Sequence, residues 1–185
     1  MAYPTVDAPY GLKPVNLIGG QVFAGSTRQM KIASNYGTAI YYGDVVKYAS
    51  DGTLEIDSGT TTATPIGVFL GVTYTDPNTS QLTFKQSYTA STVASDIMAY
   101  VLDDPDALFK VAAVSGTTTV AGYGRTIVNN NVSLVQNTGS SVTGKVNLAR
   151  GGTIQVDDLV VGQLYEIGIA SAYAGATTHI CVLQR

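Results

Sequence analysis

Short runs of hydrophobic residues alternate with polar residues and turn residues along the chain from position 21 to 115. The runs are rich in Val, Ile, Thr and Tyr, which favour strands, whereas polar helix-forming residues such as Glu, Lys and Gln are scarce. We expect strands at 21–24, 29–33, 39–48, 53–56, 65–74, 82–85, 97–102 and 108–114. Turn signals that recur between short strands are typical of sandwiches and barrels. The pattern therefore predicts an all-β fold with a β-barrel or β-sandwich body.

Two local patterns within this region predict particular structures. Asp51-Gly52 lies between two alternating runs, which is a strong hairpin signal. The run at 65–74 is almost entirely apolar, so we expect a strand that is buried on both faces or one that crosses a barrel or sandwich. Gly67 and Gly71 inside that run indicate bends or close approach of another backbone.

Two turns carry proline next to acidic residues. In Asp76-Pro77-Asn78, proline presets φ and the Asp or Asn side chain can bond its own backbone. In the acidic run at 103–106, Asp104 as N-cap and Pro105 at the first helical position predict a single helical turn.

The region after position 115 has a weaker pattern. Residues 126–136 are ambiguous between helix and strand. We favour a strand because β-branched residues and consecutive asparagines disfavour a helix. Closing strands are expected at 153–156, 159–161, 165–169 and 179–183. We therefore divide the chain into an extended N-terminal arm at 1–20, a β core at 21–115, and a second β-rich part at 116–185 that completes the fold or forms a small subdomain.

The first twenty residues contain evenly spaced prolines and end in Gly19-Gly20. Proline fixes φ and removes a hydrogen-bond donor, so this segment cannot form a helix or a central strand. One interpretation is a frayed terminus. The other, which we favour, is an arm that packs on a neighbouring molecule through Tyr3, Pro4, Pro9, Tyr10, Leu12 and Pro14.

The composition excludes several classes of protein. Charged residues make up 12% of the chain, against roughly 25% in an average soluble domain. The net charge is −3 and there is no basic run, so we expect no nucleic-acid partner. The single cysteine excludes an internal disulfide and a cysteine-based zinc cluster. No apolar stretch could span a bilayer and no secretory signal is evident, so we expect no membrane partner.

Candidate chemistry is sparse. His179 and Cys181 would share a strand face, but no carboxylate lies near them in sequence to complete a nucleophilic site. Asp103, Asp104 and Asp106 could bind calcium, yet they lack the spacing of a calcium loop, and a capped turn is the better interpretation. Paired carboxylates for glycoside cleavage and glycine-rich phosphate loops are not evident. We expect no catalytic residues, no metal, no cofactor and no enzymatic activity. No convincing set of catalytic residues supports a small hydrolase.

A surface with so few charges must consist of Thr, Ser, Asn, Gly and Tyr. The chain has 12 tyrosines, and tyrosine combines a wide apolar contact area with a polar tip. Such a surface avoids the cost of burying charges between subunits. One interpretation is a plain neutral β domain. We favour a protein whose surface is largely covered in an assembly.

Several stretches of the chain resemble virion proteins of tailed bacteriophages. They are Gly43-Asp44-Val45-Val46-Lys47 with Asp51-Gly52, Pro65-Ile66-Gly67-Val68-Phe69-Leu70-Gly71-Val72, Tyr100-Val101-Leu102-Asp103-Asp104-Pro105-Asp106-Ala107-Leu108-Phe109, and the later stretch 134–144. The similarity is closest to capsid decoration (cement) proteins of marine podophages and cyanophages. It covers more than half of the chain.

The resemblance implies a β-rich structural protein on the outer surface of an icosahedral head, assembled in the host cytoplasm. Its expected partners are the major capsid protein and further copies of itself, with a homotrimer favoured, and it offers no catalytic residues. The alternative is a phage tail or adhesion module that binds host-surface glycans, with a site formed by the loops at 60–64 and 116–125.

Overall fold

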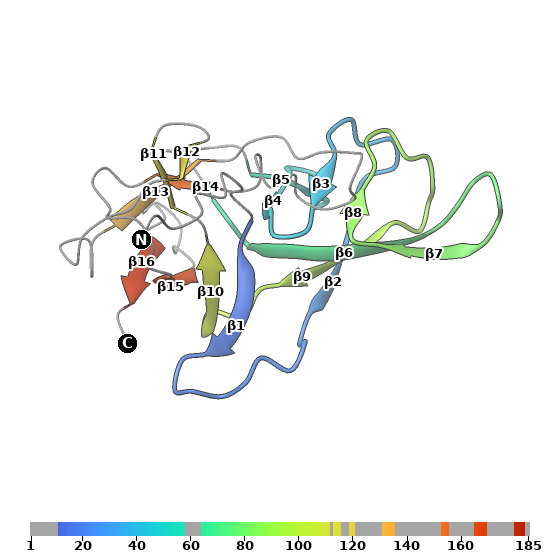
Figure 1. Ribbon diagram of the computed structural model, residues 1–185. Helices are drawn as coiled ribbons and strands as arrows, with labels where there is room; N and C mark the ends of the chain where they lie inside the picture. The colour runs from blue at the N-terminus through green and yellow to red at the C-terminus, as the bar shows by residue number, and fades with distance from the viewer. Residues whose placement is uncertain are drawn as a thin grey trace, which may run out of the picture.

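The computed structural model describes residues 11–57 and 64–111 and, beyond them, the backbone of six further strands (Figure 1). Every regular element in these residues is a strand, which confirms the all-β prediction. The first ten strands are β1 (Lys13–Leu17), β2 (Arg28–Lys31), β3 (Ile40–Tyr41), β4 (Val45–Tyr48), β5 (Leu54–Ile56), β6 (Gly67–Thr75), β7 (Leu82–Lys85), β8 (Ser87–Tyr88), β9 (Met98–Leu102) and β10 (Ala107–Val111). The later ones are β11 (Ala113–Ser115), β12 (Thr119–Val120), β13 (Asn131–Val135), β14 (Thr153–Gln155), β15 (Tyr165–Ile169) and β16 (Ile180–Leu183).

Six of the strands form an antiparallel sheet. Its order is β2-β9-β6-β4-β5, and β7 pairs with the last part of β6. A single parallel bridge between Ile32, just after β2, and Leu54 in β5 joins the two ends of this order. The sheet therefore curls until its end strands touch, but no sheet in the described residues closes into a barrel.

A hydrophobic core lies against this curled sheet. Its members come from β2, β9, β6, β4 and β5, from the residues next to β2 and β9, and from the β3–β8 pair. They include Met30, Ile32, Ile40, Val46, Leu54, Phe69, Val72, Tyr74, Tyr88, Ile97, Ala99 and Val101. Fully burying side chains of this size contributes about 1.5–3 kcal/mol each. These contacts fix the positions of β6 and β9.

A second, eight-stranded sheet has the order β1-β10-β15-β16-β13-β14-β11-β12. It combines strands from all three segments into which the sequence was divided. β1 is one of its two edge strands, and its register with β10 shifts between Pro14 and Asn16. An edge position with a bulge is where a strand tolerates proline, which cannot donate to a ladder.

Several local predictions are confirmed. β4 and β5 form the hairpin, and its turn contains Gly52 at φ 80°, with the Thr53 amide donating to Asp51 Oδ1 at 2.9 Å. β6 is buried on both faces along most of its length. In the Asp76-Pro77-Asn78 turn, the Asn78 amide donates to Asp76 Oδ1 at 2.8 Å.

Two local predictions are wrong. Residues 21–24 form only an isolated bridge between Val22 and Asn16, because the loop after β1 bonds to itself: the Leu17 amide donates to the Gln21 carbonyl at 2.8 Å. The acidic run forms a β-turn rather than a helical turn. There the Ala107 amide donates to the Asp104 carbonyl at 3.1 Å, and β10 begins at once, so no further helical bond can form.

Candidate interaction surface

The outer face of β7, β6 and β9 exposes large apolar side chains. Leu82 and Phe84 of β7 are 75% and 59% exposed, unlike the buried residues on the other side of the sheet. The register places Phe84 opposite Thr73 of β6, and Thr73 opposite Met98 of β9. We call this surface, formed by Thr73, Leu82, Phe84, Met98 and Tyr100, the β7 face. The β6–β7 hairpin extends away from the rest of the molecule in Figure 1.

Phe84 is held in place by its neighbours. Its ring meets the Tyr100 ring edge to face, with centroids 5.8 Å apart, and it lies on Gly71. A Cβ at position 71 would come within 2.7 Å of the Phe84 ring, so glycine makes room for this aromatic pair. The close contacts leave one side of Phe84 exposed in a fixed orientation, which lowers the entropic cost of binding a partner there.

The end of the hairpin is fixed by a carboxylate. Asp96 accepts hydrogen bonds from the Thr75 hydroxyl at 2.6 Å and from the Thr75 amide at 3.1 Å. These bonds lower the pKa of Asp96 below its ordinary value, since they favour the ionised form. Asp96 thus ties the loop before β9 to the last residue of β6.

We expect Asp96→Asn to make stability less dependent on acid pH. Because the folded pKa is lowered, the wild type gains from the ionised carboxylate above about pH 4, and loses this gain as the pH falls through the folded pKa. The difference in melting temperature between wild type and variant, followed by circular dichroism, should be largest near neutral pH and shrink towards pH 2–3. Thr75→Val should reproduce this pattern because it removes the hydroxyl donor. A difference in melting temperature that stays constant with pH would contradict the stabilising role of the ionised Asp96 carboxylate.

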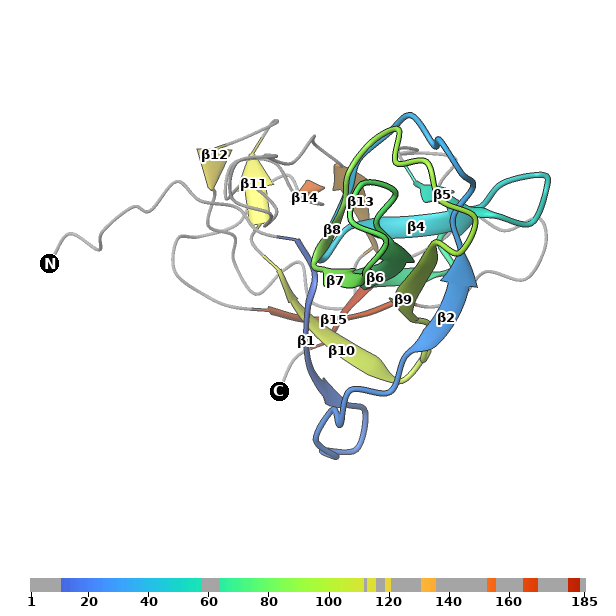
Figure 2. The same cartoon turned by 90° about the vertical axis from the view of Figure 1, so that its right-hand side faces the viewer.

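A second apolar patch lies on the loop between β1 and β2. Ile18 is 52% exposed and Val22 is 76% exposed. The loop is ordered by three backbone bonds, namely Leu17 to Gln21, Gly20 to Leu17 and Ile18 to Asp106, at 2.8, 3.1 and 2.8 Å. We call this patch the β1–β2 loop patch, and in both ribbon views the bend of the loop after β1 lies away from β7 (Figures 1 and 2).

The residues expected to anchor an arm fall into two groups. Tyr3, Pro4, Pro9 and Tyr10 lie outside the described residues. Leu12 has no exposed surface, its amide donates to the Gly43 carbonyl at 2.9 Å, and Pro14 is a half-buried residue of β1. Residues 12 and 14 are therefore covered or paired within this chain, in the region that the sequence assigned to the arm.

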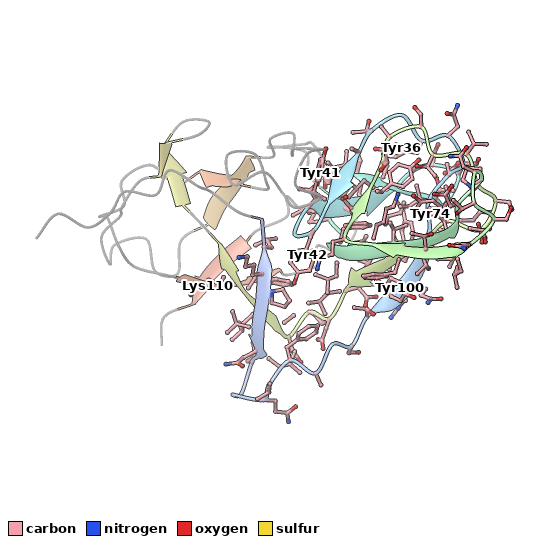
Figure 3. The ribbon with its side chains drawn as sticks, turned by 45° about the vertical axis from the view of Figure 1, so that its right-hand side comes forward. Tyr36, Tyr41, Tyr42, Tyr74, Tyr100 and Lys110 are labelled. Atoms are coloured by element: carbon pink, nitrogen blue, oxygen red, sulfur yellow. The ribbon has the colours of Figure 1, made fainter. Side chains whose placement is uncertain are left out.

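The tyrosines in the described residues differ in burial, and Figure 3 labels five of them. Tyr41, Tyr74 and Tyr88 are buried, whereas Tyr48 is 48% exposed. The Tyr88 hydroxyl donates to the Tyr36 carbonyl at 3.0 Å, and burial raises the pKa of Tyr88. Burial also raises the pKa of Tyr41, with a further contribution from nearby Asp44. Tyr36, Tyr42 and Tyr100 are half-buried, so the expectation of a surface rich in phenols is met in part, by exposed Tyr48 and by Tyr100 on the β7 face.

The acidic turn at 103–106 is a structural connection. Arg28 Nε pairs with Asp103 Oδ2 at 3.0 Å, and the Asp106 amide donates to Asp104 Oδ1 at 2.9 Å. No group of three or more His, Cys, Asp or Glu residues that could hold a metal ion occurs in the part of the chain that the structure describes. These contacts tie β2 and the β9–β10 turn together.

Two buried carboxylates were not singled out in the sequence. Asp44 and Asp57 have 0% and 1% exposure. Asp44 Oδ2 accepts from the Tyr41 amide at 2.7 Å and Asp57 Oδ2 accepts from the Thr64 amide at 2.8 Å. The turn-forming Gly43-Asp44 pair was the available signal, because Asp commonly caps a backbone turn. Both carboxylates organise loops.

The remaining candidate residues from the sequence are less defined. Cys181 lies in β16, paired with Asn131 and Gly168, whereas His179 lies outside the described residues. Of the loops considered for glycans, residues 60–63 and most of 116–125 also lie outside them.

Comparison with known proteins finds no matching family, no matching curated protein and no matching solved structure. Within the described residues there is no helix suited to crossing a membrane.

Proposed function

We propose that this protein is a structural virion protein that decorates the outer surface of an icosahedral phage head and stabilises contacts between capsomers. The observation that carries the proposal is the presence of two separate exposed apolar patches, the β7 face and the β1–β2 loop patch. A cement protein needs at least two contacts, one to the shell and one to a neighbouring subunit. The sequence resemblance to phage decoration proteins supports the same assignment.

The proposal includes a homo-oligomer, with a trimer favoured, and a body of barrel or sandwich type with an N-terminal arm. Support for the body comes from the curled six-stranded sheet and its bridge between Ile32 and Leu54. Each copy needs only moderate affinity, because many symmetric copies act together on one shell. No enzymatic step, cofactor or metal enters this mechanism.

In this proposal the β1–β2 loop patch contacts the major capsid protein. A rigid loop with two exposed aliphatic side chains loses little entropy on binding, and its apolar area contributes roughly 25 cal/mol per Å². The β7 face is left for a neighbouring subunit.

The test is binding to heads assembled from the major capsid protein of the same phage. We expect saturable binding in a fixed ratio to that protein, measured by quantified gel bands after sedimentation. The double variant Ile18→Asp with Val22→Asp should lower the affinity at least about tenfold, because it buries charge in an apolar contact. Ser26→Asp, on the same loop, adds one such charge at an exposed polar position outside the patch and should bind normally.

The result that would refute the proposal is an absence of binding by the folded wild type. The alternative, a tail or adhesion module, predicts few copies per particle and binding to host-surface glycans. The exposed aromatic ring of Phe84 is a feature that could stack on a sugar.

A further inference from the structure

We propose that the β7 face binds residues 5–8 of a second copy of this chain, added as a strand along β7. This inference rests on the assembly proposed above and names the contact between its subunits. The four residues concerned are Thr5-Val6-Asp7-Ala8, which lie between Pro4 and Pro9.

The size of the β7 face fits a short segment better than a globular domain. An aromatic side chain has on the order of 150–250 Å² to bury, so Phe84 at 59% exposure offers on the order of 100 Å². Leu82 offers a similar area at 75% exposure, and Tyr100 and Met98 are only half-buried around them. The total is well below the roughly 800 Å² per partner that a stable complex of globular proteins buries.

The edge of β7 is suited to strand addition. Among the described residues β7 pairs only with β6, so its other edge has unpaired backbone groups. Exposed Arg28 and Lys31 are the first and last residues of β2, another edge strand of this sheet, and such charges discourage pairing with a further strand. β7 contains Leu82, Thr83 and Phe84 before its single charged residue, Lys85. An added strand supplies backbone hydrogen bonds, and alternate side chains select the sequence.

Residues 5–8 match this edge in length and character. β7 has four residues, and the proline-free stretch between Pro4 and Pro9 also has four. Thr5 and Val6 are β-branched and favour strands. Proline cannot donate to a ladder, so Pro4 and Pro9 set the limits of the added strand. One register places Val6 beside Phe84.

Charge favours the same pairing. Asp7 is the one charged side chain in residues 1–10, and Lys85 at the end of β7 is the cation next to the proposed added strand. The Lys85 ammonium lies 5.3 Å from the centre of the Tyr74 ring, which holds it at this end of β7. Exposed ion pairs contribute little to affinity. Their effect here is to fix the direction and register of the added strand.

The geometry favours a second copy over the chain's own segment. Gly11 is next to Gly43, whose amide donates to the Phe69 carbonyl of β6 at 2.8 Å. Lys85 lies opposite Val72, about 10 Å further along the same edge of β6, and a strand added to β7 would lie about 5 Å beyond it. The three residues from Gly11 back to Ala8 span at most about 11 Å. The chain's own segment would have no slack to reach β7, whereas the segment of a neighbouring copy approaches freely.

The test is site-specific photocrosslinking in the full-length protein. A photoreactive phenylalanine analogue, p-benzoylphenylalanine, replaces Phe84, and in the control it replaces Val22, which is also exposed but lies in the other patch. Equal amounts of nitrogen-15-labelled and unlabelled protein are mixed when dilute, concentrated, irradiated and analysed by mass spectrometry. We expect crosslinks from position 84 to residues 1–10 in pairs of mixed isotope, at a yield about tenfold above the control.

Two further variants make the test specific. Val6→Pro blocks the ladder and should lower this crosslink about tenfold, whereas Ala2→Pro, outside the proposed strand, should leave it unchanged. Crosslinks to residues 1–10 within single-isotope species only, crosslinks to another part of the chain, or no crosslinks would overturn the inference.

Head binding, measured in parallel, separates this inference from the proposed function. Normal head occupancy without the crosslink would overturn the strand addition and retain the decoration function. The crosslink without head binding would overturn the decoration function and retain the contact between copies.

Discussion

Replacing Leu12 by alanine is expected to destabilise the protein by about 2–5 kcal/mol. Leu12 has no exposed surface, and its backbone is fixed to the Gly43 carbonyl at 2.9 Å. Truncating a fully buried leucine removes its transfer free energy and leaves a cavity that the surroundings fill only in part. The measurement is the free energy of unfolding from a urea titration, followed by circular dichroism.

The matched control is Val22→Ala. Val22 is 76% exposed, so its truncation should change the free energy of unfolding by less than about 0.5 kcal/mol. If Leu12 instead served mainly to hold a neighbouring subunit, Leu12→Ala would keep the stability of the monomer and reduce only oligomer formation or head binding. That outcome would contradict the position of Leu12 inside the body.

Leu12 also shows why the beginning of the body could not be read from the sequence. Prolines at 4, 9 and 14 indicate a segment that cannot be a central strand. β1 is consistent with this expectation, because it is an edge strand with a bulge beside Pro14. The pairing of β1 with β10 joins residues that are far apart in the chain. Such long-range pairing depends on tertiary packing, which proline spacing does not encode.

Local signals were reliable where the cause is local. The Asp51-Gly52 turn needs a residue that accepts positive φ, and Gly52 has φ 80°. The Pro77 turn depends on the φ that proline imposes and on a bond within the turn. The acidic run also turns the chain, although a strand follows it instead of a helix.

The candidate surface was harder to predict. In Leu82-Thr83-Phe84-Lys85 the alternation correctly indicates a strand with one apolar face. Alternation does not say whether that face is covered by the same chain, and here it is exposed. Tyrosine was misleading because its number in the sequence suggested a surface role. Its apolar ring also suits a core when a carbonyl accepts a hydrogen bond from the hydroxyl, as the Tyr36 carbonyl does from Tyr88.

Gly67→Ala is expected to be the most damaging small substitution in the six-stranded sheet. A Cβ at position 67 would overlap the Leu102 carbonyl oxygen and approach Val101 Cγ1 to 2.8 Å. The first of these is backbone in β9, paired with β6 through Val68 and Leu102, so relief requires the two strands to separate. Overpacking usually costs about 1–3 kcal/mol, and we expect the upper end of that range because the backbone must move.

Gly37→Ala is the control for this substitution, since nothing lies within 4 Å of a Cβ at that position. Thermal unfolding should show a clear drop in melting temperature for Gly67→Ala and almost none for Gly37→Ala. Because β7 continues the same edge of β6 that β4 occupies near Gly67, a shift of β6 should also disturb the β7 face. Crosslinking from position 84 should therefore fall together with stability in Gly67→Ala. Unchanged stability and crosslinking would mean that the Gly67–Leu102 contact does not fix the separation of β6 and β9.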